Sequence, residues 1–194
     1  MGSIDVLTVN EEPENQIDPI RVVEEARSYF STETWDDVRY IGKLKMNHDV
    51  NITMGEEHRG AFLVEKIAKR IRRIRDCELM NLLLGITTDP VIAMYYYFDG
   101  NLFRRSLFLV HDYVSEKIGI VSLFRVNEES ASKVVAHGLG HSRGLIHHYK
   151  PIDLMYSRLL NTLTLRIEGF CKDCKGKLAE TQADTQQANH NKGI

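Results

Sequence analysis

The chain has 194 residues, of which 43% are hydrophobic and 27% charged, a composition typical of a globular domain rather than a disordered or fibrous chain. Its net charge of −2 gives no support to a polyanionic partner, and its three cysteines are too few for a secreted disulfide framework. We expect a soluble cytoplasmic protein without a membrane span, because Asp89 and Pro90 interrupt the most apolar window, 80–98.

Three elements are predicted in the first half of the chain. Residues 20–30 are expected to form a helix, and the alternation of apolar and lysine side chains at the end of 37–46 predicts a strand. From residue 57 to residue 75 apolar side chains recur at helical spacing, which predicts a second helix. The apolar positions of this second helix are Leu63, Ile67, Ile71 and Ile74.

The middle of the chain contains short apolar runs that are separated by turn or polar residues. These runs predict three strands, at 90–98, 106–111 and 118–126. Asn127 follows the last run and is a favourable first residue for a helix. We expect this helix to continue through the histidine-rich part of the sequence.

The C-terminal part is expected to contain two further helices, at about 156–167 and about 172–182. Residues 181–194 are polar and have little to bury, so we expect a disordered tail. Residues 1–180 are expected to form a single α+β domain. Its sheet should lead directly into the histidine helix.

Three histidines of the histidine-rich stretch have the spacing of a metal site. His137 and His141 are four residues apart, so on a helix their side chains share one face and can bind one Zn²⁺ at roughly 2.0–2.1 Å. Gly144 can end the helix with a positive φ, and His147 could then become a third ligand and leave the fourth position for water. The alternative is a histidine-rich surface helix end, but so specific a spacing favours metal binding.

The pattern His-x-x-x-His-x-x-Gly-x-x-His, followed by Met155, resembles the metzincin motif. With its later Cys-x-x-Cys at Cys171 and Cys174, the chain resembles the archaemetzincins more narrowly, over about residues 55–180. The resemblance implies a metzincin-like fold, with a twisted mixed sheet, an active-site helix and a C-terminal helical segment bound to zinc. It also implies hydrolysis of peptide bonds by metal-activated water, with Met155 as the hydrophobic floor of the site.

Gly138 stands where the resemblance places the glutamate that acts as general base. Such a base contributes roughly 10²–10⁴-fold to the rate, so we expect impaired hydrolysis and cannot assign a catalytic residue. Because Gly138 and Gly140 each cost about 1 kcal/mol relative to Ala in a helix, we infer that room is kept near the metal for another carboxylate or a ligand. Glu128, Glu129 and Glu168 are candidate replacements. Alternatively the site keeps zinc for shape alone, and activity would return only on Gly138→Glu.

A second zinc site is implied by the same resemblance. The first cysteine pair of the family falls at His148 and Asp153, and both residue types bind zinc. With Cys171 and Cys174 they would form a closed, structural site, which gives two zinc ions per chain. The alternatives are a redox cysteine pair, two unrelated thiols, or an exchange of roles between His148 and His147.

Basic side chains surround the isoleucine positions of the expected helix at 57–75. They could track the phosphates of a nucleic acid, but no aromatic residue accompanies them, so a solvated helix face is the better interpretation. Cys77, at the end of this helix, is expected to be a small buried hydrophobe. Two functions remain open. One is a zinc peptidase that acts on a peptide or protein, and the other is a non-catalytic zinc protein (a pseudoenzyme) that binds a peptide or protein. A nucleic-acid-associated protein is a more distant third.

Overall fold

A computed structural model gives the fold. It describes residues 2–10, 18–32, 34–78, 80–115, 117–151, 153–157, 167 and 169–190.

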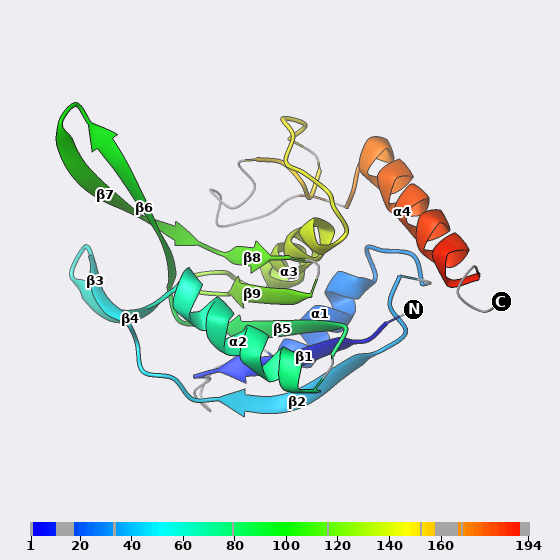
Figure 1. The fold of residues 1–194 in the computed structure, drawn as a ribbon, viewed down its shortest axis with the longest axis horizontal. Helices are drawn as coiled ribbons and strands as arrows, with labels where there is room; N and C mark the ends of the chain where they lie inside the picture. The colour runs from blue at the N-terminus through cyan, green and yellow to red at the C-terminus, as the bar shows by residue number, and fades with distance from the viewer. Residues whose placement is uncertain are drawn as a thin grey trace.

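A five-stranded sheet lies at the centre of the molecule (Figure 1). Its strands are β1 (Ile4–Val9), β2 (Val38–Leu44), β5 (Leu82–Thr87), β8 (Asp112–Val114) and β9 (Ile118–Ser122). They follow the order β2-β1-β5-β9-β8, in which only the pair β8–β9 is antiparallel. Strands β1, β5 and β9 are buried along their whole length, as expected for parallel strands covered on both faces.

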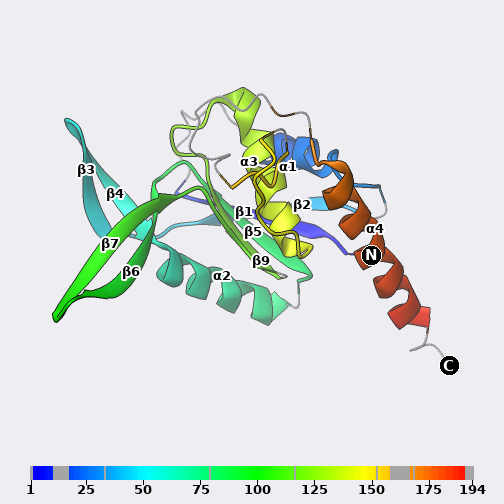
Figure 2. The same cartoon turned by 90° about the horizontal axis from the view of Figure 1, so that it is seen from above.

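A second sheet projects from one end of the molecule (Figures 1 and 2). It consists of β3 (Val50–Met54), β4 (Glu57–Leu63), β6 (Val91–Asp99) and β7 (Leu102–Val110), in the order β3-β4-β6-β7. The β6–β7 hairpin extends away from the body, and consecutive side chains on it are exposed, so both of its faces meet solvent. Its exposed aromatic residues are Tyr95, Tyr96, Tyr97, Phe98, Phe103 and Phe108.

The described residues form four helices, of which the first three pack against the central sheet. They are α1 (Pro19–Arg27), α2 (Val64–Glu78), α3 (Glu128–Ser142) and α4 (Lys172–His190). Figure 2 shows α1 and α3 on one face of the sheet and α2 on the other. Two hydrophobic cores result, one between the sheet and α1, α3 and the C-terminal segment, the other between the sheet and α2. No described helix has the length and hydropathy needed to cross a membrane.

The histidine helix begins where the sequence predicts. The side-chain oxygen of Asn127 accepts a hydrogen bond from the Ser130 N–H at 2.9 Å, which satisfies one of the unpaired donors of the first turn of α3. Ser122, the last residue of β9, precedes this cap closely, so the sheet leads directly into the helix. The expected α+β architecture is confirmed.

Several local expectations differ from the structure. Residues 57–63 were expected to be helical but form strand β4, so the helix begins at Val64. The sequence does not predict β1, β3 or β8. The helix expected at about 156–167 lies almost entirely outside the described residues. Helix α4 extends to His190, into the segment expected to be disordered, and residues 191–194 lie outside the described part.

Candidate metal centres

Helix α3 and the turn that follows it bring three histidines together. His137 and His141 lie one turn apart on α3, and the chain reverses at Gly144, whose φ of +78° is in the left-handed region. The Nε2 atom of His147 lies 3.0 Å from that of His137 and 3.1 Å from that of His141. The two helical Nε2 atoms are 3.3 Å apart. The three nitrogens therefore form a compact triangle.

The hydrogen bonds of the two helical rings fix their tautomers. Nδ1 of His137 lies 2.5 Å from the carbonyl oxygen of Leu154, and Nδ1 of His141 lies 3.0 Å from that of Leu145. Because a carbonyl oxygen only accepts, each Nδ1 carries the proton and each Nε2 an unshared lone pair. Burial lowers the pKa of both histidines, which favours these neutral, metal-binding forms.

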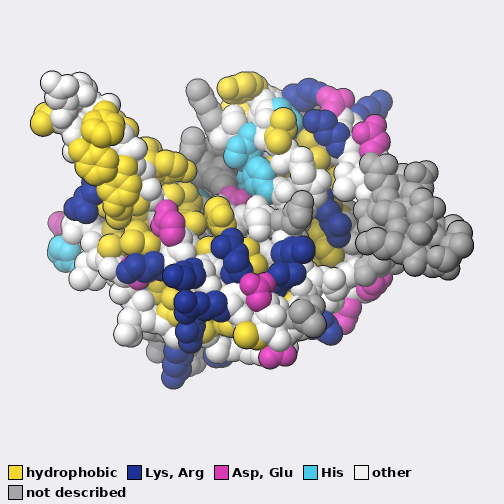
Figure 3. Space-filling model, in the orientation of Figure 1, with side chains coloured by type: hydrophobic (Ala, Val, Ile, Leu, Met, Phe, Trp, Pro, Cys, Tyr) yellow, Lys and Arg dark blue, Asp and Glu magenta, His cyan; other side chains and the backbone are white. Residues whose placement is uncertain are grey.

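The triangle fits a zinc ion. Lone pairs face one another across the 3.3 Å between Nε2 of His137 and Nε2 of His141, and they repel unless a cation lies between them. Tetrahedral zinc, with bonds of 2.0–2.1 Å to nitrogen, separates neighbouring ligand atoms by about 3.3 Å. The triangle of Nε2 atoms matches that spacing and leaves one corner of the tetrahedron free. His147 is exposed and His141 partly buried, so the cluster meets the molecular surface, and Figure 3 shows histidine side chains gathered on one face.

Met155 lies beneath the histidine helix. Its side chain is fully buried, and a Cβ atom added to Gly140 would come within 2.7 Å of its sulfur. The neighbouring Leu154 supplies the carbonyl that orients the His137 ring. This segment therefore both packs under α3 and holds one of the three imidazoles.

A second cluster joins the turn after α3 to the start of α4. His148, Asp153, Cys171 and Cys174 each offer one ligand atom, and these atoms all lie within 4.8 Å of one another. Nε2 of His148 is 2.8 Å from Oδ2 of Asp153 and 3.5 Å from Sγ of Cys174. The backbone N–H of Cys171 donates to the same carboxylate at 2.9 Å. The site is closed, as structural zinc sites are.

The pKa values of this cluster argue against a redox cysteine pair. Burial raises the pKa of Asp153, but hydrogen bonds from Cys171 and from the backbone N–H of Met155 outweigh it and lower the pKa to about 2. Burial, followed by the nearby Asp153 carboxylate, raises the pKa of Cys174 to about 12. A redox pair needs a thiol of lowered pKa. A metal ion, in contrast, displaces the thiol proton as it binds.

The two adjacent histidines belong to different clusters. His147 lies with the two helical histidines, whereas His148 lies with Asp153 and the cysteines. The structure therefore does not group His148 with His137 and His141, which is the exchange of roles that the sequence leaves open.

The room that the sequence indicates at Gly138 is already filled by strand β8. A Cβ atom added to Gly138 would lie 2.8 Å from Cγ2 of Val114 and 3.4 Å from Oδ2 of Asp112. The first distance is shorter than real Cβ contacts, so a side chain at position 138 requires the Val114 side chain to shift. Gly138→Glu alone is for this reason a poor test of lost chemistry.

None of the three candidate glutamates is brought to the metal site by the described structure. Glu128 and Glu129 lie exposed in the first turn of α3, about 12 Å along the helix from His137. Glu128 pairs instead with Arg21 at 3.5 Å. Glu168 lies outside the described residues.

Asp112 is the acidic residue that the structure does place beside the histidines. Its Oδ1 lies 4.0 Å from Nε2 of His137, and its side chain is only 8% exposed. The pKa of Asp112 is raised above its ordinary value because the side chain is buried, and the nearby His141 and His147 offset only part of this rise. The sequence offers no spacing that identifies Asp112, because the pairing of β8 with β9 brings it to the site. The one hint in the sequence is that Asp112 lies in a short segment just before strand β9, which itself precedes the histidine helix α3.

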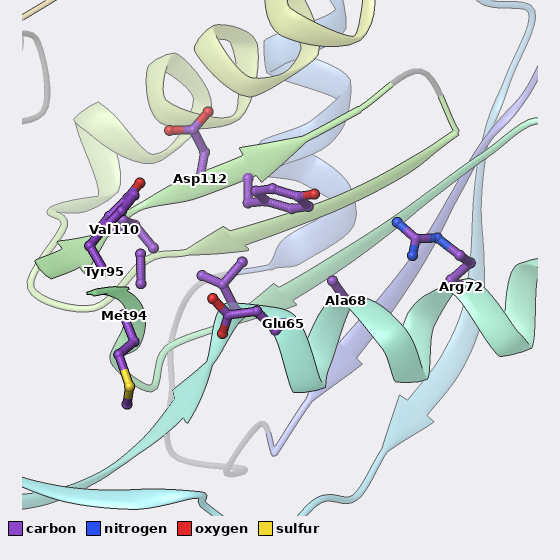
Figure 4. A pocket seen from close by; sticks show the side chains of 10 residues that line it. Glu65, Ala68, Arg72, Met94, Tyr95, Val110 and Asp112 are labelled. Carbon is purple, nitrogen blue, oxygen red and sulfur yellow. The ribbon is translucent and has the colours of Figure 1, made fainter. Parts of the chain in front are cut away.

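A pocket of about 450 Å³ lies between α2 and the base of the β6–β7 hairpin (Figure 4). Glu65, Ala68 and Arg72 line it from α2, and Met94 and Tyr95 from β6. Asp112 also borders the pocket, and Figure 4 shows its carboxylate directed toward α3. One residue of β8 therefore adjoins both this pocket and the histidine cluster.

The basic side chains of α2 form a solvated face, visible as a band of Lys and Arg in Figure 3. The helix packs on the sheet through Val64, Ile67 and Ile71, which agrees with the interpretation of a surface helix. Cys77 is exposed, so its expected burial is wrong. It follows Arg75 in the last turn, where the helix no longer lies over the sheet core.

Solved structures share this fold. The archaemetzincin from Methanopyrus kandleri superposes with a TM-score of 0.65 at 18% identity, over 94% of this chain and 96% of that chain. A zinc-dependent peptidase from Methanocorpusculum labreanum has a TM-score of 0.58 at 18% identity, over 90% and 99% of the two chains. The archaemetzincin from Archaeoglobus fulgidus, complexed with malonate, has a TM-score of 0.56 at 15% identity, over 90% and 99%. No family model and no curated protein sequence matches the chain. The fold is therefore archaemetzincin-like.

Proposed function

We propose that this protein is a zinc-dependent peptidase that hydrolyses peptide bonds in a peptide or protein. The observation that carries the proposal is the triangle of Nε2 atoms at 3.0, 3.1 and 3.3 Å, which has the size of three corners of a zinc tetrahedron. Zinc in such an open site polarises a carbonyl group and lowers the pKa of water to about 7. The zinc-dependent peptidase of the same fold from Methanocorpusculum labreanum supports this choice of metal and reaction.

Different residues would bind the catalytic zinc, orient its ligands and bind the structural zinc. His137, His141 and His147 hold the metal, and the carbonyl oxygens of Leu154 and Leu145 fix the two helical rings. A second zinc at His148, Asp153, Cys171 and Cys174 fastens the start of α4 to the segment that carries Met155. The catalytic ion thus lies on a floor that the structural ion holds in place.

Gly138 supports an alternative function, that of a non-catalytic zinc protein which binds a peptide or protein partner. Glycine at this position removes the carboxylate that α3 would otherwise offer to the site. The three free cysteines agree with a reducing, cytoplasmic location for either function.

Elemental analysis and a peptidase assay test the proposal together. We expect close to two zinc ions per chain, falling to one in a Cys171→Ser/Cys174→Ser variant and unchanged in Cys77→Ser, whose thiol is exposed and lies outside both clusters. We expect hydrolysis of fluorogenic peptides that a chelator abolishes and added zinc restores. Two zinc ions without hydrolysis would establish the non-catalytic alternative. Absence of zinc in the native protein would overturn both functions.

A further inference from the structure

We infer that Asp112, from strand β8, is the carboxylate base of the histidine site in place of the residue that position 138 lacks. The inference rests on the proposed peptidase function and assigns the catalytic residue that this function needs. In this arrangement the base reaches the reacting atoms from the edge of the sheet rather than from the metal-binding helix.

The first observation is that Asp112 lies beside the space into which a side chain at position 138 would grow. From a Cβ atom built on Gly138, Oδ2 of Asp112 is 3.4 Å away and Cβ of Asp112 is 3.5 Å away. A glutamate at position 138 would have to extend into the volume that this carboxylate and Val114 occupy. Asp112 thus supplies the same chemical group from the other side of that volume.

The second observation is the position of the carboxylate relative to the three nitrogens. Oδ1 of Asp112 is 4.0 Å from Nε2 of His137, too far for a direct hydrogen bond. The ligand atoms that converge at this site are those of the three histidines, and Asp112 is not part of that group. The carboxylate therefore lies next to the metal position without joining it, where it can contact a water molecule at the open corner.

The third observation is that the Asp112 side chain is largely enclosed by the protein. It is only 8% exposed, and its carboxylate approaches Nε2 of His137 at 4.0 Å. Buried carboxylates are normally satisfied by donors. The polar groups close to Asp112 are imidazoles, those of His111, His137, His141 and His147. The ring of His137 is held toward the metal position by Leu154. A donor that arrives with the metal, such as water, would satisfy Asp112.

The chemistry of the step needs only groups already named. Asp112 accepts a proton from water as the water oxygen bonds to the carbonyl carbon of the substrate. The protonated Asp112 then gives that proton to the amide nitrogen as the carbon–nitrogen bond breaks. The products are a carboxylic acid and an amine, and Asp112 returns to its charged form.

The test uses Asp112→Asn, which keeps the shape of the side chain but cannot accept the proton. We expect kcat to fall by about 10²–10⁴-fold while the zinc content stays at the native value. The matched control is Glu129→Gln, which removes an exposed carboxylate from the same helix as the histidines and should leave kcat unchanged. Full activity of Asp112→Asn beside an active native protein would overturn the inference and leave the proposed function intact.

A second measurement does not depend on hydrolysis. With Co²⁺ in the histidine site, azide binding at the open corner can be followed by absorption spectroscopy. A negative Asp112 beside that corner repels the anion, so Asp112→Asn should bind azide about tenfold more tightly. Unchanged azide affinity would place the carboxylate away from the open corner and overturn the inference even if activity fell. An inactive native protein would overturn the proposed function, and the inference with it.

A relocation variant guards against misfolding of Asp112→Asn. Asp112→Ala/Val114→Ala/Gly138→Glu removes the two side chains that crowd position 138 and places the carboxylate on α3. We expect it to recover at least tenfold of the rate lost in Asp112→Ala/Val114→Ala. No recovery by a variant that retains its zinc would contradict the equivalence of the two positions.

Discussion

Glycine at position 140 is required by packing against the methionine below it. A Cβ atom there would lie 2.7 Å from the Met155 sulfur and 3.4 Å from Leu145 and Phe170. We expect Gly140→Ala to lower the free energy of unfolding by about 1–3 kcal/mol, because overpacking outweighs the better helix propensity of alanine. Denaturant unfolding would measure the difference.

Gly176 provides the control for this substitution. It lies exposed in α4 and has no atom within 4 Å of an added Cβ. Gly176→Ala should therefore be neutral or stabilise the protein by up to about 1 kcal/mol through helix propensity. Equal effects at the two positions would show that contact with Met155 is unimportant.

The adjacent histidines should have separable effects on metal content. We expect His147→Ala to lose one zinc and all peptide hydrolysis, because its Nε2 completes the open triangle. His148→Ala should lose the other zinc and keep the ion of the histidine triangle, because its partners are Asp153 and the cysteines. Zinc analysis of the two variants, each serving as the control for the other, checks this. Loss of both ions from one variant would contradict two independent sites.

The spacing of residues in the sequence predicts the histidine cluster but does not predict Asp112, the acidic residue beside it. His137, His141 and Gly144 are local on a helix and its C-terminal turn, so a period of 3.6 and one positive φ bring them together. Asp112 precedes His137 by a strand, a turn and another strand. Its approach depends on the register of β8 against β9, which pairs Asp112 with Val121. The sequence contains no local sign of that pairing.

At the scale of elements, the cap of the histidine helix is a separable contribution to stability. The side chain of Asn127 accepts from Ser130 N–H, and no described metal ligand touches it. We expect Asn127→Ala to lower the free energy of unfolding by about 1 kcal/mol without changing the zinc content. Asn127→Asp should retain the stability, since aspartate caps equally well. A loss of zinc in Asn127→Ala would mean that the cap also sets the metal geometry.

Helices and strands were predicted correctly where a single periodicity of apolar residues dominates the sequence. The amphipathic pattern of α2 is real, but the helix begins at Val64 because residues Glu57–Leu63 pair with β3 and β6. Leu63 is the first position of the helical spacing, and strand pairing overrides that spacing there. Its side chain is only partly buried. Strand β1 was missed because its buried run contains Asp5 and Thr8, two polar residues that are nonetheless enclosed by the parallel sheet.

At the scale of the whole molecule, metal removal should loosen the C-terminal half. The second cluster connects His148 and Asp153 to Cys171 and Cys174, so its ion joins segments far apart in the chain. An ion present at a hundred times its Kd adds about 2.7 kcal/mol to the free energy of unfolding. For a chain of this size that corresponds to about 5–10 °C in Tm. Thermal unfolding with and without chelator would check this, and Cys171→Ser/Cys174→Ser should respond less.

The β6–β7 hairpin should dominate the affinity of the protein for hydrophobic dyes. Phe98 and Phe103 are 73% and 64% exposed and contact each other near its tip. We expect Phe98→Ser/Phe103→Ser to reduce the fluorescence of bound anilinonaphthalene sulfonate at least twofold, with Tm unchanged because neither ring belongs to the two cores. Tyr149→Ser removes a single exposed ring away from the hairpin and serves as the control. An equal decrease there would contradict a contiguous patch.

The contact of β8 with Gly138 also limits the order in which this sequence can change. A chain with glutamate at position 138 and an unchanged β8 suffers the clash with Val114, and a chain with neither acid has no base at the site. A stepwise change that avoids both strain and loss of the base therefore begins at Val114, continues with glutamate at position 138, and loses Asp112 last. A library of single-site variants would contain glutamate on α3 only together with the Val114 clash, whereas a library that varies positions 112, 114 and 138 together would contain it without the clash.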